Sequence, residues 1–263
     1  MDTALITGST DGLGAEVARR LADRGRHVIV HGRDRDRGET VVSEIDSGGG
    51  SAEFRRADLA ELAEVRDLAD SVRSEHDRLD LLINNAGVWV TGGRKESEDG
   101  YELHFAVNYL AHYVLTRRLL PMLRESAPAR IINVASGAQE ALDFDDLMLG
   151  RGYSPGSGYA RSKLAQVLFT VDLAERLDDE GVDVVALHPA TLMDTRMVRE
   201  AGRRPRSSVD EGARAVVHLA TAPGPESGQY FNGTEPARAH DQAYDASARE
   251  RLREVSEELT EAP

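Results

Sequence analysis

The sequence predicts an α/β fold: a single doubly wound domain over residues 1–263, with a parallel sheet of about seven strands covered by helices on both faces. Two observations lead to this prediction. Short, almost continuous apolar runs of strand length alternate with longer segments of helical period, and parallel strands buried on both faces have this composition. No internal repeat, low-complexity segment or linker divides the chain, and its length suits one large α/β domain.

The expected elements alternate along the chain. The strand-like runs cover residues 4–6, 27–30, 52–54, 79–83, 130–134, 182–187 and 229–231. The helical segments cover roughly residues 13–24, 36–46, 61–74, 101–125, 159–179 and 209–221. A polar helix over about 246–260 ends the chain, and we expect it to be solvated, to cover a pocket edge or to form a subunit contact.

The chain is strongly acidic and contains no cysteine. With 46 acidic and 32 basic side chains its net charge is −14, so we expect it to bind neither nucleic acid nor an anionic membrane. The absence of cysteine excludes disulfides, thiolate catalysis and cysteine-ligated zinc, and we expect no metal site. No apolar run approaches membrane-spanning length, and the first strand-like run begins almost at residue 1, which predicts a cytoplasmic protein without a signal peptide.

A glycine-rich turn links the first predicted strand to the first predicted helix. Gly8, Gly12 and Gly14 have the spacing Gly-x3-Gly-x-Gly. Glycines here let the backbone turn tightly and approach a phosphate, and the following helix N-terminus offers free N–H groups and the positive end of its dipole. A glycine cluster alone is equally a bare turn, but its position between strand and helix favours a dinucleotide site.

Tyr159 and Lys163 form the most informative pair in the chain. At a separation of four residues on a helix, both side chains share one face. The chain has two lysines, Lys95 and Lys163, against thirty arginines, so a lysine kept beside a tyrosine indicates chemistry that arginine cannot perform. A phenol beside an ammonium ionises more readily, which predicts a lowered pKa for Tyr159 and an acid/base near neutral pH.

These features belong to an ordered set of motifs that resembles the short-chain dehydrogenase/reductase family, in its single-domain branch. The stretch 105–112 and the long gap from Ser136 to Tyr159 further resemble the retinol-dehydrogenase-like reductases. The resemblance implies a Rossmann-like domain and an NAD(P)-dependent oxidoreductase that transfers a hydride between nicotinamide and a carbonyl or secondary alcohol. The matching motifs are Thr-Gly-x3-Gly-x-Gly at 7–14, Asp58-Leu59, Asn84-Asn85-Ala86-Gly87, Asn108, Ser136 and Tyr159-x3-Lys163.

The resemblance also implies catalytic roles. Hydride transfer to a carbonyl requires a proton donor and a group that polarises the oxygen. Tyr159 would donate the proton, and Lys163 would lower its pKa and bond the nicotinamide ribose. Ser136 would hydrogen-bond the substrate carbonyl, and Asn108 would hold a water that relays protons to Lys163. Taken singly, Ser136 is equally a turn serine and Asn108 a buried residue bracing its helix, but the complete set favours catalysis.

The end of the second predicted strand indicates the cofactor. NAD-specific domains place an acid there, whereas this chain has Gly32 followed by Arg33. No carboxylate repels a 2′-phosphate, and a guanidinium binds phosphate bidentately and stacks on adenine, so NADP(H) is favoured over NAD(H). Arg33 is otherwise one exposed arginine among thirty, and pairing with Asp34 would weaken the assignment. By the resemblance Asp58 bonds the adenine amino group; alone, it equally caps the next helix.

The segment after the sixth predicted strand departs from the family pattern. Ala190 replaces the usual glycine after Pro189, and Thr195 comes six residues past that proline instead of five. Whether Thr191 or Thr195 takes the hydroxyl role is open, and Leu192 is expected to offer its backbone to the nicotinamide carboxamide. Residues 190–208 are expected to form the substrate lid, or else a plain solvated loop. The complete predicted cofactor set is Gly8, Ser9, Thr10, Asp11, Gly12, Leu13, Gly14, Arg33, Asp58, Leu59, Asn85, Ala86, Gly87, Tyr159, Lys163, Pro189, Thr191, Leu192 and Thr195.

The remaining candidates favour structural roles. His104, His112 and His188 lack metal-ligand spacing and are interpreted as packing or polar surface residues. Trp89 and Val90 either line the nicotinamide pocket or cap the sheet, and the acidic stretch 143–146 is interpreted as a solvated loop.

Other functions remain open at this point. A non-catalytic dinucleotide-sensing regulator would be expected to lose the tyrosine, lysine or serine. A nucleotide-sugar epimerase or dehydratase has a different glycine spacing, and an enoyl reductase spaces its tyrosine and lysine more widely. The expected partner is a small carbonyl or alcohol substrate. The substrate itself, the direction of the reaction and assembly into a homo-oligomer, dimer or tetramer, are not determined.

Overall fold

The computed structural model describes residues 2–178 and 180–261. Its eight-stranded sheet has the order β3-β2-β1-β4-β5-β6-β7-β8, and each neighbouring pair is parallel except β7 with β8. This confirms the predicted doubly wound α/β fold and adds one short antiparallel edge strand. The strands are β1 Thr3–Ile6, β2 His27–Gly32, β3 Ser51–Arg56, β4 Leu81–Asn84, β5 Ala129–Val134, β6 Val182–His188, β7 Tyr230–Asn232 and β8 Glu235–Ala237.

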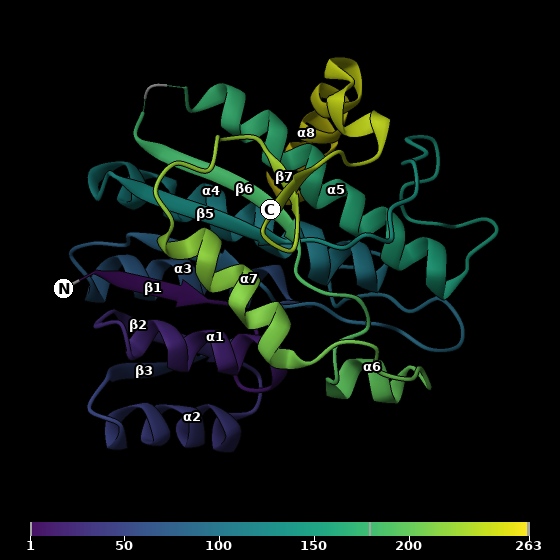
Figure 1. The fold of residues 1–263 in the computed structure, drawn as a ribbon. Helices are drawn as coiled ribbons and strands as arrows, with labels where there is room; N and C mark the ends of the chain where they lie inside the picture. The colour runs from purple at the N-terminus through teal and green to yellow at the C-terminus, as the bar shows by residue number, and fades with distance from the viewer. Residues whose placement is uncertain (1, 179, 262–263) are drawn as a thin grey trace.

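Helices cover both faces of this sheet (Figure 1). Helices α1, α2 and α7 pack on one face, whereas α3, α4 and α5 pack on the other, with α8 beyond α5. The helices are α1 Gly12–Ala22, α2 Arg35–Ser47, α3 Leu62–Glu75, α4 Ala111–Glu125, α5 Pro155–Arg176, α6 Arg196–Glu200, α7 Val209–Thr221 and α8 Ala246–Glu261, with a π-helical turn η1 at Phe105–Leu110 and a 3-10 turn η2 at Asp241–Tyr244.

Alternation along each buried strand divides the core into two layers. In β1, Leu5 packs with the α3, α4 and α5 side, whereas Ala4 and Ile6 pack with the α1 and α7 side. All three are fully buried, which explains why the strand reads as a continuous apolar run rather than an alternating one.

Polar caps fix where several helices begin. Ser154 accepts a hydrogen bond from Ser157 N, and Pro155 occupies the first turn, so α5 starts four residues earlier than predicted. Asp34 caps α2 by accepting from Arg37 N, and Ser208 caps α7 by accepting from Glu211 N. The predicted end of the α5 segment at residue 179 lies outside the described residues.

Three elements of the structure differ from the prediction. The single helix expected over 101–125 is instead the π-helical turn η1 followed by α4, and α6 was not expected. The solvated interpretation of the last helix is wrong, because α8 packs back on the domain. Leu252 is buried in the core, and the buried Ser256 hydroxyl lies 2.7 Å from the Tyr109 hydroxyl. Within 2–178 and 180–261, no helix combines the length and apolar character needed to cross a membrane.

Candidate active site

The predicted site residues meet at the carboxyl ends of the central strands. β1 pairs with β2 on one side and with β4 on the other, so the chain's progression through the sheet reverses there. Ligands of open α/β sheets bind outside the strand ends at such a reversal. The glycine turn follows β1, and the segments bearing Asn85, Ser136 and Pro189 follow β4, β5 and β6 at the same edge (Figure 1).

The turn after β1 is built so that only glycine fits. Gly8 and Gly12 have φ values of 64° and 53°, in the left-handed region. A Cβ at Gly8 would lie 2.8 Å from the Ala86 Cα, and one at Gly14 would lie 2.3 Å from the Gly8 carbonyl oxygen. The turn therefore packs tightly against the β4 loop and leads directly into the N-terminus of α1, an arrangement suited to a phosphate.

Two side chains, which directly follow β1 and β4, support this turn. The Thr7 hydroxyl accepts hydrogen bonds from the backbone N–H groups of Asn85 and Ala86, both at 2.9 Å. The Asn85 amide donates to the carbonyls of Thr7 at 2.8 Å and Gly8 at 3.1 Å. The predicted Asn85 and Ala86 therefore hold the turn in place.

Some predicted contact residues face inward. Ser9 is fully buried; its hydroxyl donates to Ile6 O at 2.7 Å and accepts from His31 N at 3.0 Å, so it joins β1 to β2. Leu13 and Leu59 are buried core residues. Asp11 is exposed and accepts from Gly12 N at the start of α1. The sequence could not separate these structural positions from contacts with a ligand.

Arg33 lies at the end of β2, with its side chain 62% exposed. Its partner is Asp58, at 3.3 Å, and not Asp34, which pairs with Arg37 at 3.2 Å. Asp58 also accepts from Ala60 N at 3.0 Å. Gly32 is required for packing, because a Cβ there would lie 2.6 Å from Thr10 Cγ2.

Helix α5 presents Tyr159 and Lys163 on one face. Lys163 is buried, and its ammonium lies 5.8 Å from the centre of the Tyr159 ring. The ammonium donates to Val134 O and to Gln166 Oε1, both at 2.8 Å. Burial lowers the pKa of Lys163 to about 7, which brings its titration near neutral pH.

The predicted lowering of the Tyr159 pKa is wrong. Burial raises the pKa of Tyr159, and a hydrogen bond with Ser136 and the charge of Arg203 oppose that rise without reversing it. Desolvation of the phenolate therefore outweighs the neighbouring cation, and Tyr159 holds its proton at neutral pH.

Asn108 and Ser136 are both held by protein groups. In η1, Asn108 Oδ1 accepts from Val88 N at 2.7 Å, and its amide donates to Ser162 Oγ at 2.9 Å. Ser136 Oγ accepts from Ala138 N at 3.1 Å, and its carbonyl accepts from the Tyr230 hydroxyl at 3.0 Å. Asn108 therefore braces its helix, and Ser136 stabilises a turn, as their structural interpretations predicted. Both residues nevertheless lie at the site.

The segment after β6 folds over the turn. Thr195 lies close to the glycine turn, because a Cβ at Gly12 would be 3.2 Å from its Cγ2. The Thr191 hydroxyl instead lies 3.0 Å from His188 Nε2. The base of residues 190–208 is closed by hydrogen bonds from Arg206 N to Leu192 O at 2.9 Å and from Asp194 N to Ser207 O at 3.0 Å. Leu192 has a φ of 48°, unusual for a residue other than glycine, while Pro189 is buried. Met197 reaches towards Gly87, where its Cε would lie 3.8 Å from a Cβ.

A buried network that the sequence interpretation missed connects the turn to α5. Thr7 Oγ1 already accepts two N–H groups, so it donates to His112 Nε2 at 3.0 Å. His112 Nδ1 therefore carries the proton and donates to Asn108 O at 3.0 Å. Burial lowers the pKa of His112 to about 3, so the ring is neutral. Gln166, beside it, accepts from Lys163.

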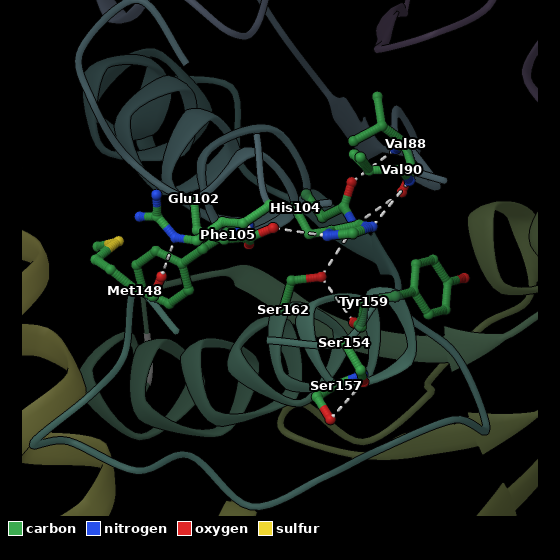
Figure 2. A network of polar contacts seen from close by, with 12 residues as sticks. Val88, Val90, Glu102, His104, Phe105, Met148, Ser154, Ser157, Tyr159 and Ser162 are labelled. Carbon is green, nitrogen blue, oxygen red and sulfur yellow. Dashed lines mark hydrogen bonds and ion pairs between the residues drawn. The ribbon is translucent and has the colours of Figure 1, made fainter. Parts of the chain in front are cut away.

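His104 belongs to a second buried network (Figure 2). Its Nε2 accepts from Val90 N at 2.9 Å, so Nδ1 carries the proton and donates to Glu102 Oε1 at 2.8 Å. A Cβ at Gly158 would lie only 2.7 Å from that Nδ1. The His104 and Tyr159 rings meet edge to face, with centres 6.3 Å apart. The surface interpretation of His104 and His112 is therefore wrong, and packing with full hydrogen bonding is right.

Acidic and histidine clusters elsewhere have local roles. In the 143–146 loop, Asp146 accepts from Gly150 N and Arg151 N. His27, Glu53 and His76 come together at the opposite, amino ends of β2 and β3, a set that chain spacing did not reveal. Its carboxylate is satisfied by His76 at 2.8 Å and Arg55 at 3.0 Å, so the cluster is explained without an ion.

The fold and the turn define a dinucleotide-binding α/β protein, and comparisons with known proteins agree. Residues 2–206 match the family described as short chain dehydrogenase. Human retinol dehydrogenase 12 is 38% identical over 270 residues, covering 97% of this chain and 85% of the relative. The chain belongs to the short-chain dehydrogenase family, in its retinol-dehydrogenase-like subgroup, and is an NAD(P)-dependent oxidoreductase.

Solved structures show the same fold. A Mycobacterium paratuberculosis crystal structure is 32% identical with a TM-score of 0.84, covering 100% of this chain and 94% of the other. A metagenomic short-chain oxidoreductase in complex with NADP is 28% identical with a TM-score of 0.69, covering 91% of this chain and 97% of the other.

Proposed function

We propose that this protein interconverts a carbonyl and an alcohol with NADP(H) as the favoured cofactor and Tyr159 as the acid/base. One observation carries the proposal: Tyr159, whose pKa Ser136 lowers against the effect of burial, lies on the same helix face as the buried Lys163, at the strand ends that bear the glycine turn. A proton donor, a carbonyl-polarising hydroxyl and a cation are thereby held beside a phosphate-type cradle.

The cradle fits a dinucleotide. The space that a Cβ would fill at Gly8 and Gly14 is already occupied by the β4 loop and the turn itself, which leaves a smooth backbone surface at the start of α1. Gly12, Thr195 and the residues around Gly87 would hold the pyrophosphate and nicotinamide ends, and Asp58 the adenine end. When bound, the nicotinamide supplies or accepts the hydride.

Each catalytic side chain has a defined task in this proposal. Tyr159 keeps its proton at neutral pH because burial raises its pKa, so it is ready to protonate an alkoxide during reduction. Ser136 lowers the free-energy cost of forming the Tyr159 phenolate, and it can also hydrogen-bond the substrate oxygen. Lys163, with a pKa near 7, can hold a positive charge or pass a proton. Asn108 fixes the loop at Val88 and orients Ser162 on α5.

The preference for NADP(H) rests on Arg33. Its exposed guanidinium stands at the end of β2, where an acid would select NAD, and its pairing with Asp58 is a long one at 3.3 Å that a phosphate can replace. A related short-chain oxidoreductase was solved with NADP. A cytoplasmic location and a single domain stay predictions of the sequence.

A substrate screen tests the proposal. Purified protein is mixed with NADPH and a panel of aldehydes and ketones, and loss of NADPH absorbance is followed, with NADH in parallel. We expect turnover that is faster with NADPH at equal, subsaturating concentrations. Tight NADPH binding without turnover across the panel would instead favour the dinucleotide-sensing regulator.

A further inference from the structure

Arg203 of the lid, Trp89 and Tyr159 form a stack beside the reactive phenol. The Arg203 guanidinium carbon lies 4.8 Å from the centre of the Trp89 ring, and the Trp89 ring lies 4.9 Å from that of Tyr159. The lid fixes this placement: Gly202 ends the α6 turn with a φ of 67°, and Arg203 N donates to Val198 O at 3.1 Å. The Arg203 side chain is thereby directed back over the Trp89 ring.

Within residues 2–178 and 180–261, no carboxylate neutralises the charge of Arg203. The chain carries 46 acidic residues, and two other lid arginines form ion pairs with such residues. Arg196 lies 3.8 Å from Asp11, and Arg199 lies 2.8 Å from Asp194. Among the described residues Arg203 has no carboxylate partner, and its contact is the face of Trp89. Its charge nevertheless reaches the Tyr159 phenol, whose pKa it lowers against the effect of burial.

We propose that Arg203 binds a carboxylate on the substrate, while Trp89 packs against the apolar part between that carboxylate and the reacting carbonyl. The enzyme then prefers aldehydes or ketones that bear an anionic group about one aromatic ring away. A guanidinium stacked on an aromatic face keeps its N–H donors free at the edge, where a carboxylate accepts two hydrogen bonds. The inference rests on the proposed carbonyl chemistry and adds the substrate class.

Matched substrates test this preference in kinetics. Para-formylbenzoate and levulinate are compared with their methyl esters, which keep the carbonyl and the shape but lack the charge. In Arg203→Ala, kcat/KM for the acids should fall by roughly 10-fold or more, while the esters change by less than about 3-fold. Arg203→Lys should retain part of the preference, and Arg204→Ala, an exposed neighbour in the same lid, should retain all of it. Equal losses for acids and esters in Arg203→Ala would overturn the proposal.

The cofactor is the other anion that Arg203 could bind. Dissociation constants for NADPH are therefore measured in the wild type and in Arg203→Ala at fixed salt. Unchanged NADPH affinity supports the substrate role. An affinity loss as large as the loss in kcat/KM for the acids would mean that Arg203 binds a cofactor phosphate, which contradicts the proposal.

Trp89 gives a readout that does not depend on turnover, because it is the only tryptophan in the chain. Terephthalate, which has the carboxylates but no reducible carbonyl, is titrated into the protein with NADP+ present. The emission of Trp89 should change saturably in the wild type and Arg204→Ala and not in Arg203→Ala. Such binding without turnover of any acid or ester would refute the proposed function and leave the anion site standing. No saturable response in the wild type would refute the anion site, whatever the turnover.

Discussion

The Lys163 ammonium donates a hydrogen bond of 2.8 Å to the side chain of Gln166, less than one turn further along α5. Gln166 is itself buried and lies beside the neutral His112. Among the described residues, the ammonium has one other acceptor, the Val134 carbonyl. The amide of Gln166 therefore helps to keep a cation in a site where burial lowers its pKa to about 7.

We predict that Gln166 sets the pH dependence of the reaction. Because the ammonium of Lys163 is lost as the pH rises through about 7, reductive kcat/KM should fall over that range. Gln166→Glu adds a negative charge, raises the pKa of Lys163 and should move this fall to higher pH. Gln166→Leu removes the acceptor and should move it to lower pH. Profiles of kcat/KM against pH that coincide with the wild type in both variants would rule out the role of Gln166.

Tyr159→Phe should abolish turnover, because it removes only the phenolic proton. NADPH binding, measured by fluorescence titration, should stay within about 3-fold of the wild type, since the ring and its packing remain. A near-wild-type kcat would refute Tyr159 as the acid.

Lys163→Arg should also impair turnover severely although the charge is kept. The planar guanidinium cannot replace a compact ammonium between Val134 O and Gln166 Oε1. The measurement is kcat at saturating NADPH, after circular dichroism has confirmed folding. Recovery of most activity would show that charge alone suffices.

Arg33→Ala should weaken NADPH binding far more than NADH binding. Loss of a charge-assisted phosphate contact costs about 1.5–3 kcal/mol, or roughly 10- to 150-fold in affinity. Dissociation constants for both cofactors at fixed salt check this. An equal loss for both would mean that Arg33 only stacks on adenine. An acid at Gly32 is a poorer test, because its Cβ would lie 2.6 Å from Thr10 Cγ2 and would disturb the turn.

Gly158→Ala should destabilise the protein by about 1–3 kcal/mol, because overpacking displaces buried groups. Its Cβ would lie 2.7 Å from His104 Nδ1 and 3.2 Å from Glu102 Oε1. Gly156→Ala on the same helix is the matched control: its Cβ meets only Ser154 Oγ, at 3.8 Å, and alanine favours helix. Urea unfolding of the two variants gives the comparison. Equal free energies of unfolding for the two variants would show that the Glu102–His104 pair moves aside at little energetic cost.

The sequence by itself determined the alternation of strands and helices, the glycine turn and the helical Tyr159–Lys163 pair. These are local properties: apolar periodicity, conformational freedom at Gly8 and Gly12, and a four-residue spacing are written directly in the chain. The helix over 101–125 was predicted in position but not in form. The π-helical turn at Asn108 depends on hydrogen bonds with segments that are distant in the chain, and the local sequence does not specify those bonds.

Tertiary structure decided the partners and the environment. It placed the half-buried Tyr159 beside the buried Lys163, so desolvation governs both pKa values, and the expected lowering for Tyr159 became a rise. It paired Arg33 with Asp58 instead of the adjacent Asp34, and it buried His104 and His112 within hydrogen-bond networks. It also brought Arg203 to Trp89 across more than a hundred residues of chain. Burial and long-range contact depend on how distant segments pack, and no spacing along the chain contains that information.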